Sequence, residues 1–281
     1  MHDVAANTLF VVSTPIGNLG DISLRALAVL RRVTTICCED TRHARTLLQR
    51  FGIRTATIAL HEHNESQVAP RLVERMRNGE SLALISDAGT PLMSDPGERL
   101  VRLAIEAGVQ VVPIPGASSA LAALVGSGLV PHPCTMLGFL PRKGAERREM
   151  VAFAARLPHT VVLFESPNRL VDTLQELVGA TALVSGSPRT VAVARELTKH
   201  YEEFRRGTLG EVAAYFEETP ARGEIVIVLA GAPAVAVSED ELKEVADALR
   251  ANGVASRDIV QRLMDAHGAS RNLAYRLAHD P

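Results

Sequence analysis

The N-terminal part of the chain alternates short apolar runs with longer amphipathic stretches. The apolar runs have the length and composition of buried strands and cover residues 9–13, 34–38, 55–60, 81–86 and 109–114. The stretches between them have helical periodicity and cover residues 23–32, 41–52, 66–78 and 96–107. Because neighbouring parallel strands need crossover connections, this alternation predicts βαβ units built around a parallel sheet.

The middle of the chain has a different pattern, in which strand candidates dominate. They cover residues 134–141, 160–166, 190–198, 202–209 and 224–231, and helix candidates cover 144–156, 167–178 and 209–218. The strands at 190–198 and 202–209 are joined by a short connection that is typical of a hairpin. We therefore predict a second sheet that mixes parallel and antiparallel strands.

The C-terminal part is predicted to be helical after a linker at 231–238. Ser238 and Glu241 have the spacing of a capping box at the start of a helix. Two shorter helical segments, 256–268 and 270–280, follow and are joined by a Gly-containing turn. Two short helices in this arrangement resemble a helix-turn-helix.

These patterns together predict the fold class and the domain organisation. We expect an α/β protein with a parallel-sheet domain at 1–116 and a mixed-sheet domain at 117–232. A small helical module at 238–281 completes the chain.

Composition narrows the range of functions. With 281 residues, 47% of them hydrophobic and 22% charged, the chain is typical of a globular protein with sizeable cores. A net charge of −2 provides no global positive field for nucleic acid, although a local basic patch suffices for RNA. The N-terminus has no signal-peptide pattern, so we expect a cytoplasmic protein. Cys37 and Cys38 lie in an apolar run, which favours buried free thiols.

Polar and backbone-shaping residues follow each of the five predicted N-terminal strands. The strand ends read STPIGNLGD, EDTR, HEHNE, SDAGTPLMSDPG and PGASSA. Because ligands bind beyond the carboxyl ends of strands in an open parallel sheet, we expect a binding site at this edge, in a cleft between the two domains. The fourth of these loops also contains Asp95 and Pro96, which suit the N-cap and first position of the next helix.

No standard phosphate or nucleophile motif accompanies these loops. Gly17 and Gly20 fit neither a dinucleotide fingerprint nor a Walker A motif. His61 and His63 leave a metal site open as an alternative, but no third ligand can be named and we expect no metal. These residue patterns alone do not name a cofactor.

Read together, several motifs resemble one known family. TPIGNLGDIS, CEDTRHARTLL, SDAGTPLMSDPG, PGASSALAAL, GFLPRKG and ESPNRL are similar to the ribosomal RNA small subunit methyltransferase I family, within the tetrapyrrole-methylase fold class. The resemblance runs from about Leu9 to Gly231, and the helical tail is similar to that family's C-terminal module. It implies S-adenosylmethionine-dependent 2′-O-methylation of a cytidine ribose in small-subunit (16S) ribosomal RNA, by a homodimer that acts on the RNA or on the assembled subunit.

The resemblance also implies where the cofactor binds. Its contacts would come from the loops after the fourth and fifth strands and from the second domain: Asp87, Ala88, Gly89, Thr90, Pro91, Ser118, Ser119, Phe164, Glu165, Ser166, Gly223, Glu224 and Ile225. Glycine and proline shape such turns, and apolar walls suit an adenine ring.

The implied reaction needs a group that takes the proton of the ribose hydroxyl. The candidates at the strand ends are Asp21, Glu39, Asp40, His63 and Glu65, with Arg42 placed to orient phosphate or lower the pKa of the hydroxyl. Asp40 with Arg42 is our first choice. The alternative is that Asp40 only caps the following helix, with Arg42 in its first turn.

Basic residues for the RNA backbone form two groups in the sequence. Arg142, Lys143, Arg147 and Arg148 make up the densest one, and the tail contributes Arg257 and Arg271. For the tail arginines, solvated helix faces are the other interpretation. Two rival functions stay open: a methyltransferase acting on a tetrapyrrole of the precorrin type, and a non-catalytic RNA-binding protein that has kept the fold.

Overall fold

The computed structural model describes residues 4–185, 187–233 and 239–279. Contacts along the chain define two compact units, Met1–Gly231 and Ala232–Pro281. Both sheets lie in the first unit. The predicted division at residues 116 and 117 is therefore a subdivision of that unit and stays a prediction.

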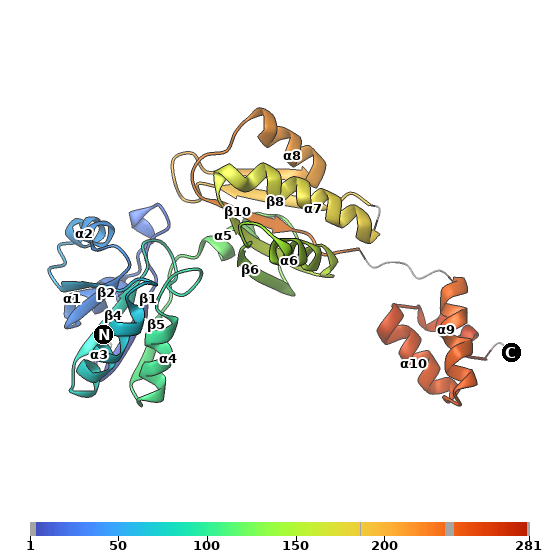
Figure 1. Cartoon of the computed structure of the whole chain (residues 1–281), viewed down its shortest axis with the longest axis horizontal. Coiled ribbons are helices and arrows are strands. Elements are labelled where there is room, and N and C mark those ends of the chain that lie inside the picture. The colour runs from blue at the N-terminus through green and yellow to red at the C-terminus, as the bar shows by residue number, and fades with distance from the viewer. Residues whose placement is uncertain (1–3, 186, 234–238, 280–281) are drawn as a thin grey trace. The chain divides into compact units, whose positions relative to one another are not determined.

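The first sheet confirms the prediction of parallel βαβ units. Its five strands are β1 (Thr8–Val12), β2 (Thr35–Cys38), β3 (Ala56–Ala59), β4 (Ser81–Ile85) and β5 (Gln110–Ile114), and they lie in the order β3-β2-β4-β1-β5. Figure 1 labels β1, β2, β4 and β5. The connecting helices are α1 (Leu24–Arg32), α2 (Thr41–Arg50), α3 (Glu65–Arg77) and α4 (Glu98–Glu106), and a short 3-10 helix η1 (Leu19–Asp21) precedes α1.

Both faces of this sheet are covered by helices, which explains why its strands are continuous apolar runs. Helices α1 and α2 pack on one face and α3 and α4 on the other. Adjacent strand residues point to opposite faces, so Cys38 joins the first cluster and Cys37 the second. Both are free thiols, and burial raises the pKa of Cys37 to about 12 and that of Cys38 to about 11.

The second sheet is mixed, as the sequence predicts. Its order is β6-β7-β10-β8-β9, with β6 (Cys134–Phe139), β7 (Thr160–Glu165), β8 (Thr190–Arg195), β9 (Glu203–Thr208) and β10 (Ile225–Leu229). Strands β6 and β7 are parallel, and every other neighbouring pair is antiparallel, including the β8–β9 hairpin.

Helices cover both faces of this sheet as well. One face packs against α6 (Ala145–Arg156), α7 (Leu170–Ser185) and α8 (Leu209–Glu218), and the other against α5 (Ser119–Gly126). A 3-10 turn η2 (Pro167–Arg169) leads into α7. Helix α7 is longer than predicted because its second half still packs on the core through Ala180 and the buried Thr181, and this packing outweighs the low helix propensity of Gly179 and its β-branched neighbours.

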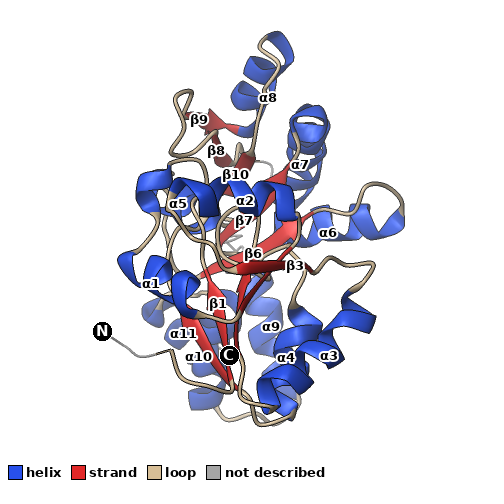
Figure 2. Ribbon diagram, turned by 90° about the vertical axis from the view of Figure 1, so that its left-hand side faces the viewer, coloured by secondary structure: helices blue, strands red, loops and turns tan. Residues whose placement is uncertain are grey.

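The C-terminal unit contains α9 (Glu239–Ala251), α10 (Ser256–His267) and α11 (Arg271–His279), labelled in Figure 2. Its core is formed by Leu242, Ala246, Ile259, Leu263 and Leu277, together with small residues of α11. Ser238, the predicted N-cap of α9, lies outside the described residues. Within the described ranges, no helix combines the length and the apolar character needed to cross a bilayer.

Candidate functional site: a cavity at the strand ends

The loops that follow β1, β4 and β5 are joined to one another by hydrogen bonds. The carboxyl ends of these strands are adjacent in the sheet. Thr14 N donates to Gly89 O over 2.8 Å, and Gly89 N donates back to Thr14 O over 3.1 Å. The hydroxyls of Ser13 and Thr90 lie 3.0 Å apart, and Thr90 Oγ1 donates to Ala117 O over 3.1 Å. Three loops that are distant in sequence thus form one rigid rim.

The loop after β4 requires unusual backbone conformations. Gly89 has φ +82°, and a Cβ at this position would lie 3.1 Å from Cγ2 of Ile16. Leu92 and Ser94 also have positive φ, +73° and +72°, which is uncommon for residues with a side chain. Such strain is typical of functional sites, where surrounding structure holds the backbone in place.

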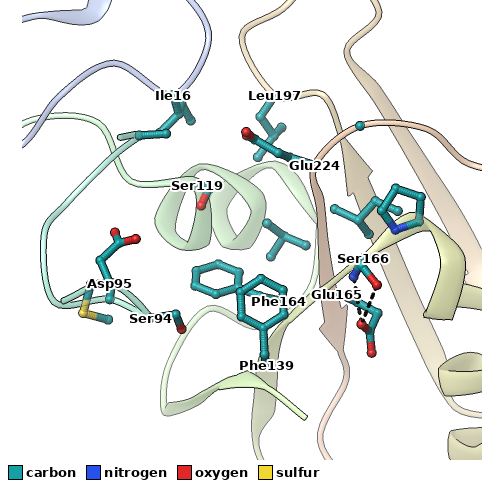
Figure 3. Close-up of a pocket in the computed structure, with 16 residues that line it drawn as sticks. Ile16, Ser94, Asp95, Ser119, Phe139, Phe164, Glu165, Ser166, Leu197 and Glu224 are labelled. Atoms are coloured by element: carbon teal, nitrogen blue, oxygen red, sulfur yellow. Dashed lines mark hydrogen bonds between the residues drawn. The ribbon is translucent and has the colours of Figure 1, made fainter. Parts of the chain in front are cut away.

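A cavity of about 360 Å³ opens beside this loop, between residues of the two sheets (Figure 3). Its apolar wall contains Phe139 and Phe164, whose ring centroids lie 5.5 Å apart at an angle of 53°. Asp95 and Ser94 lie on one side and Ser166 on the other. The full lining is Ile16, Ala88, Met93, Ser94, Asp95, Ser119, Phe139, Phe164, Glu165, Ser166, Pro167, Leu197, Gly223, Glu224, Ile225 and Val226.

Glu165 lines this cavity, but its carboxylate is committed to its own neighbourhood. Its side chain is fully buried and accepts hydrogen bonds from Ser166 N over 2.8 Å and from Thr173 Oγ1 over 2.7 Å. Arg169 Nε lies 3.3 Å from it. The carboxylate therefore fixes the turn that follows β7 and presents Ser166 to the cavity.

The buried position of Arg147 contradicts its predicted contact with RNA. Arg147 is 6% exposed, because α6 turns it inward. Its Nε lies 2.9 Å from Glu176 Oε2, its Nη2 donates to Thr173 Oγ1 over 2.8 Å, and Glu165 lies 4.0 Å away. A guanidinium in this position cannot reach RNA and instead supports the Glu165 turn. Its neighbours Arg142, Lys143 and Arg148 are exposed.

Asp95 occupies a different position from the predicted one. Helix α4 begins at Glu98 with Gly97 as N-cap, so Asp95 does not cap it. Its carboxylate faces the cavity and makes no hydrogen bond or ion pair with the residues that the structure describes. Burial, together with the nearby carboxylates Glu39 and Asp87, raises the pKa of Asp95 to about 6.

A second cavity, of about 520 Å³, adjoins the first and shares Ile16, Ala88 and Glu224 with it. Its remaining lining includes the polar residues Thr14, His43, Thr46, Asp87 and Lys199.

Hydrogen bonds and ion pairs connect the polar residues of this second cavity. His43 Nδ1 lies 2.8 Å from Asp87 Oδ2, and this hydrogen bond raises the pKa of His43. Lys199 Nζ lies 2.8 Å from Glu196 Oε1 and 3.4 Å from Glu224 Oε2, which connects the loop after β8 with the start of β10.

The predicted catalytic residues are not brought together. Asp40 is the N-cap of α2 and accepts from Arg42 N over 2.8 Å and from Arg42 Nη2 over 2.6 Å. This pairing holds the pKa of Asp40 well below its usual range. Glu65 accepts from Leu100 N at the start of α4, and Asp21 lies in the 3-10 turn after β1. These four residues line neither cavity.

The predicted cofactor residues cluster much better. Eight of them line the first cavity: Ala88, Ser119, Phe164, Glu165, Ser166, Gly223, Glu224 and Ile225. Asp87 lines the second cavity. Gly89 and Thr90 hold the rim together, Pro91 follows them in the loop, and Ser118 caps α5 by accepting from Leu121 N.

Sequence reasoning missed part of the lining. Met93, Ser94 and Asp95 belong to the same loop as the predicted residues. The positive φ of Ser94 has no signal in the sequence, because serine does not favour that conformation. Phe139 ends β6 and Leu197 follows β8 in the second sheet, where an apolar residue gives no sign that it lines a cavity. Among the described residues, no group of three or more His, Cys, Asp or Glu side chains is placed to hold a metal ion.

The fold and this cavity define the class of protein. Residues 8–213 match the family model of the tetrapyrrole (corrin/porphyrin) methylases. Among solved structures, diphthine synthase has a TM-score of 0.59 at 16% identity, covering 79% of this chain and 90% of that one. Uroporphyrin-III C-methyltransferase from Thermus thermophilus, complexed with S-adenosylhomocysteine, has a TM-score of 0.56 at 19% identity, covering 79% and 97%. At these low identities the similarity shows that the fold is shared, and it carries no further conclusion.

Closer relatives place the chain within this class. It is 40% identical to ribosomal RNA small subunit methyltransferase I of Streptococcus pyogenes, over 98% of this chain and 96% of that protein. It is 49% identical to the protein of the same name in Xylella fastidiosa, over 80% and 82%. The corresponding values for Mesorhizobium japonicum are 44%, 96% and 90%. The chain belongs to the ribosomal RNA small subunit methyltransferase I family.

Proposed function

We propose that this chain transfers a methyl group from S-adenosylmethionine to the ribose 2′-oxygen of a cytidine in small-subunit ribosomal RNA. The observation that carries the proposal is the near full-length similarity to relatives that share one name, combined with a cavity at the ends of the parallel strands. Distant structures with tetrapyrrole substrates in their names share only the fold.

The first cavity fits the methyl donor in size and chemistry. Its volume of about 360 Å³ lies in the range of small-molecule sites. The Phe139 and Phe164 rings offer an apolar wall for an adenine, while Ser119, Ser166 and the backbone at Ala88 offer hydrogen bonds. When bound, S-adenosylmethionine supplies an electrophilic methyl group on a positively charged sulfur.

The second cavity is suited to the acceptor nucleotide. It adjoins the first, and its lining includes the polar side chains of Thr14, Thr46 and Lys199, which can hydrogen-bond a nucleotide. A target nucleotide turned out of its RNA strand would bring its ribose to the boundary at Ala88 and Glu224. Holding the hydroxyl close and aligned is the main requirement of this reaction, because the sulfonium is already a good leaving group.

We assign Asp95 as the carboxylate that accepts the proton of the ribose hydroxyl. Glu165 and Glu224 also line the cavity, but both are engaged by cations or hydrogen bonds. A pKa of about 6 leaves Asp95 ionised at neutral pH and still basic enough to take a proton. Asp40 is a much weaker base because Arg42 stabilises its charged form.

The RNA is proposed to lie over exposed basic residues. Arg142, Lys143 and Arg148 are available for backbone contacts, and Arg257 and Arg271 of the C-terminal unit are exposed as well. A homodimer, the assembled small subunit as substrate and a cytoplasmic location belong to the same proposal and follow from the resemblance to the family.

Methyl transfer from labelled S-adenosylmethionine tests the function directly. The purified chain is expected to label RNA in small ribosomal subunits taken from cells that lack the gene, and mass mapping is expected to place the methyl group on a cytidine ribose. Labelling of a precorrin with no labelling of the RNA would overturn the proposal in favour of the tetrapyrrole alternative. Absence of cofactor binding in calorimetry would favour a non-catalytic RNA-binding protein.

A further inference from the structure

A groove lies between α10 and α11 of the C-terminal unit. It encloses about 520 Å³ and is lined by Arg257, Val260, Gln261, Met264, Arg271, Tyr275 and His279. The three α11 residues are four positions apart, so they share one face of that helix. The core of the unit includes Ile259, Leu263 and Leu277, and the groove residues Val260 and Met264 pack against its edge. The groove is therefore a surface feature that the core leaves open.

An aromatic pair forms one side of this groove. The rings of Tyr275 and His279 are stacked, with centroids 4.1 Å apart and an angle of 24° between their planes. His279 Nδ1 lies 2.9 Å from Tyr275 O, which holds the imidazole against the phenol. Tyr275 nevertheless remains 59% exposed. A rigid, exposed aromatic face of this kind is what unpaired nucleobases stack on.

Cationic side chains lie at the same groove. Arg257 and Arg271 make no hydrogen bond or ion pair with any residue in the described ranges. Arg250 and Arg276, by contrast, are engaged by Asp247 and Glu239. Two arginines of this small unit are thus held by its own acids, while the two at the groove are available for an anion.

We propose that the groove between α10 and α11 binds an unpaired ribonucleotide, with its base stacked on Tyr275 and its flanking phosphates at Arg257 and Arg271. The proposal rests on RNA being the substrate and adds a binding site whose lining belongs entirely to the C-terminal unit. An acidic peptide would satisfy the arginines but has no need of the stacked face.

A single-tryptophan variant reports on this stacking directly. The chain contains no Trp, so Tyr275→Trp in the full-length protein places the only indole in the groove. We expect saturable quenching of its fluorescence by a short oligocytidylate and none by inorganic tripolyphosphate, which has charge but no base. Ile105→Trp is the matched control, because Ile105 is 62% exposed on α4, outside the C-terminal unit, and lines neither of the two cavities at the strand ends. Equal quenching by both probes, or quenching of both variants alike, would overturn the proposal.

Affinity measurements separate stacking from charge. Tyr275→Leu is expected to weaken oligocytidylate binding by roughly 5- to 150-fold, whereas Tyr275→Phe keeps the ring and binds like the parent. Arg271→Gln is expected to reduce the magnitude of the slope of log affinity against log salt by about 0.7. Arg276→Gln is expected to leave this slope unchanged, because the guanidinium of Arg276 already binds Glu239. Unchanged affinity in Tyr275→Leu contradicts the site.

The outcome is distinguishable from that of the proposed function. If Tyr275→Leu binds RNA normally while the protein methylates ribosomal RNA, the groove proposal fails and the function stands. If the protein never methylates RNA but the tryptophan at position 275 is quenched only by the oligonucleotide, the groove is an RNA site and the function fails.

Discussion

Thr14 and Gly89 exchange both of their backbone hydrogen bonds, so that the loops after β1 and β4 behave as one rim of the cavity. The two residues are far apart in sequence and meet only because β1 and β4 are neighbours in the sheet. This contact requires the left-handed conformation of Gly89, which a side chain at that position would strain. The rigidity of the rim is therefore open to a direct test.

Gly89→Ala is expected to lower the stability of the fold by about 1 kcal/mol or more and to weaken S-adenosylmethionine binding. An alanine at this position would have to adopt φ +82°, and its Cβ would press on Ile16, which lines both cavities. Thermal unfolding and calorimetry measure the two effects. Gly108→Ala is the matched control, since Gly108 has φ +73° with nothing within 4 Å of its Cβ position. It is expected to lose stability without losing cofactor affinity; an equal loss of affinity would show that the effect is not local.

Asp95→Asn is expected to slow methyl transfer by roughly 10²- to 10⁴-fold with little change in cofactor affinity. The acid limb of the pH–rate profile of the parent should follow the pKa of about 6. Glu39→Gln removes a carboxylate that raises this pKa, so it should move the limb to lower pH. A parental rate in Asp95→Asn, or a limb that Glu39→Gln does not move, would remove Asp95 from the proton transfer.

The same carboxylate makes the stability of the fold depend on pH. The pKa of Asp95 is raised from 3.8 to about 6 on folding, so the folded state disfavours its ionised form. As pH rises between these values, the unfolded chain loses this proton first and stability falls. Asp95→Asn should therefore unfold at a higher temperature than the parent above pH 6, and this advantage should vanish below pH 3.8, where the carboxyl is protonated in both states. An advantage that is constant with pH would contradict the assigned pKa.

Asp40→Asn is expected to retain both stability and methyl transfer. Asn caps a helix about as well as Asp does, so the variant keeps the role that the structure assigns to Asp40. Asp40→Ala should instead lose about 1 kcal/mol of stability, measurable by urea unfolding, and still methylate. A large loss of rate in Asp40→Asn, with cofactor and RNA binding intact, would restore Asp40 as the base.

Arg147→Met is expected to destabilise the protein by about 1–3 kcal/mol, because it removes the buried guanidinium that donates to Thr173 and pairs with Glu176, while Glu165 keeps its contact with Arg169. Arg148→Met, at the exposed neighbouring position, should change stability by less than about 0.5 kcal/mol. RNA affinity should rank the two variants in the opposite order. Arg148→Met should weaken RNA binding if this segment faces the RNA backbone. Equal stability of the two variants would contradict the buried network around Glu165.

The pattern of apolar residues determined much of this protein. Continuous apolar strands alternating with amphipathic helices predict a parallel sheet, because only a sheet covered on both faces buries every residue of a strand. The close succession of β8 and β9 predicts the hairpin for a similarly local reason. The glycine and proline residues of the loop after β4 predict a binding site, and the resemblance of the surrounding motifs identified the family.

Only the tertiary structure decided which side chains line the cavity and which lie elsewhere. Arg142, Lys143, Arg147 and Arg148 read as one basic cluster, yet the turn of α6 places Arg147 in the interior, where it pairs with glutamates from other elements. Asp95 reads as a helix cap, but the backbone between Leu92 and Gly97 carries it to the cavity. Local patterns record which backbone a segment prefers, whereas burial, charge partners and pKa depend on residues that are distant in sequence and meet only in the folded chain.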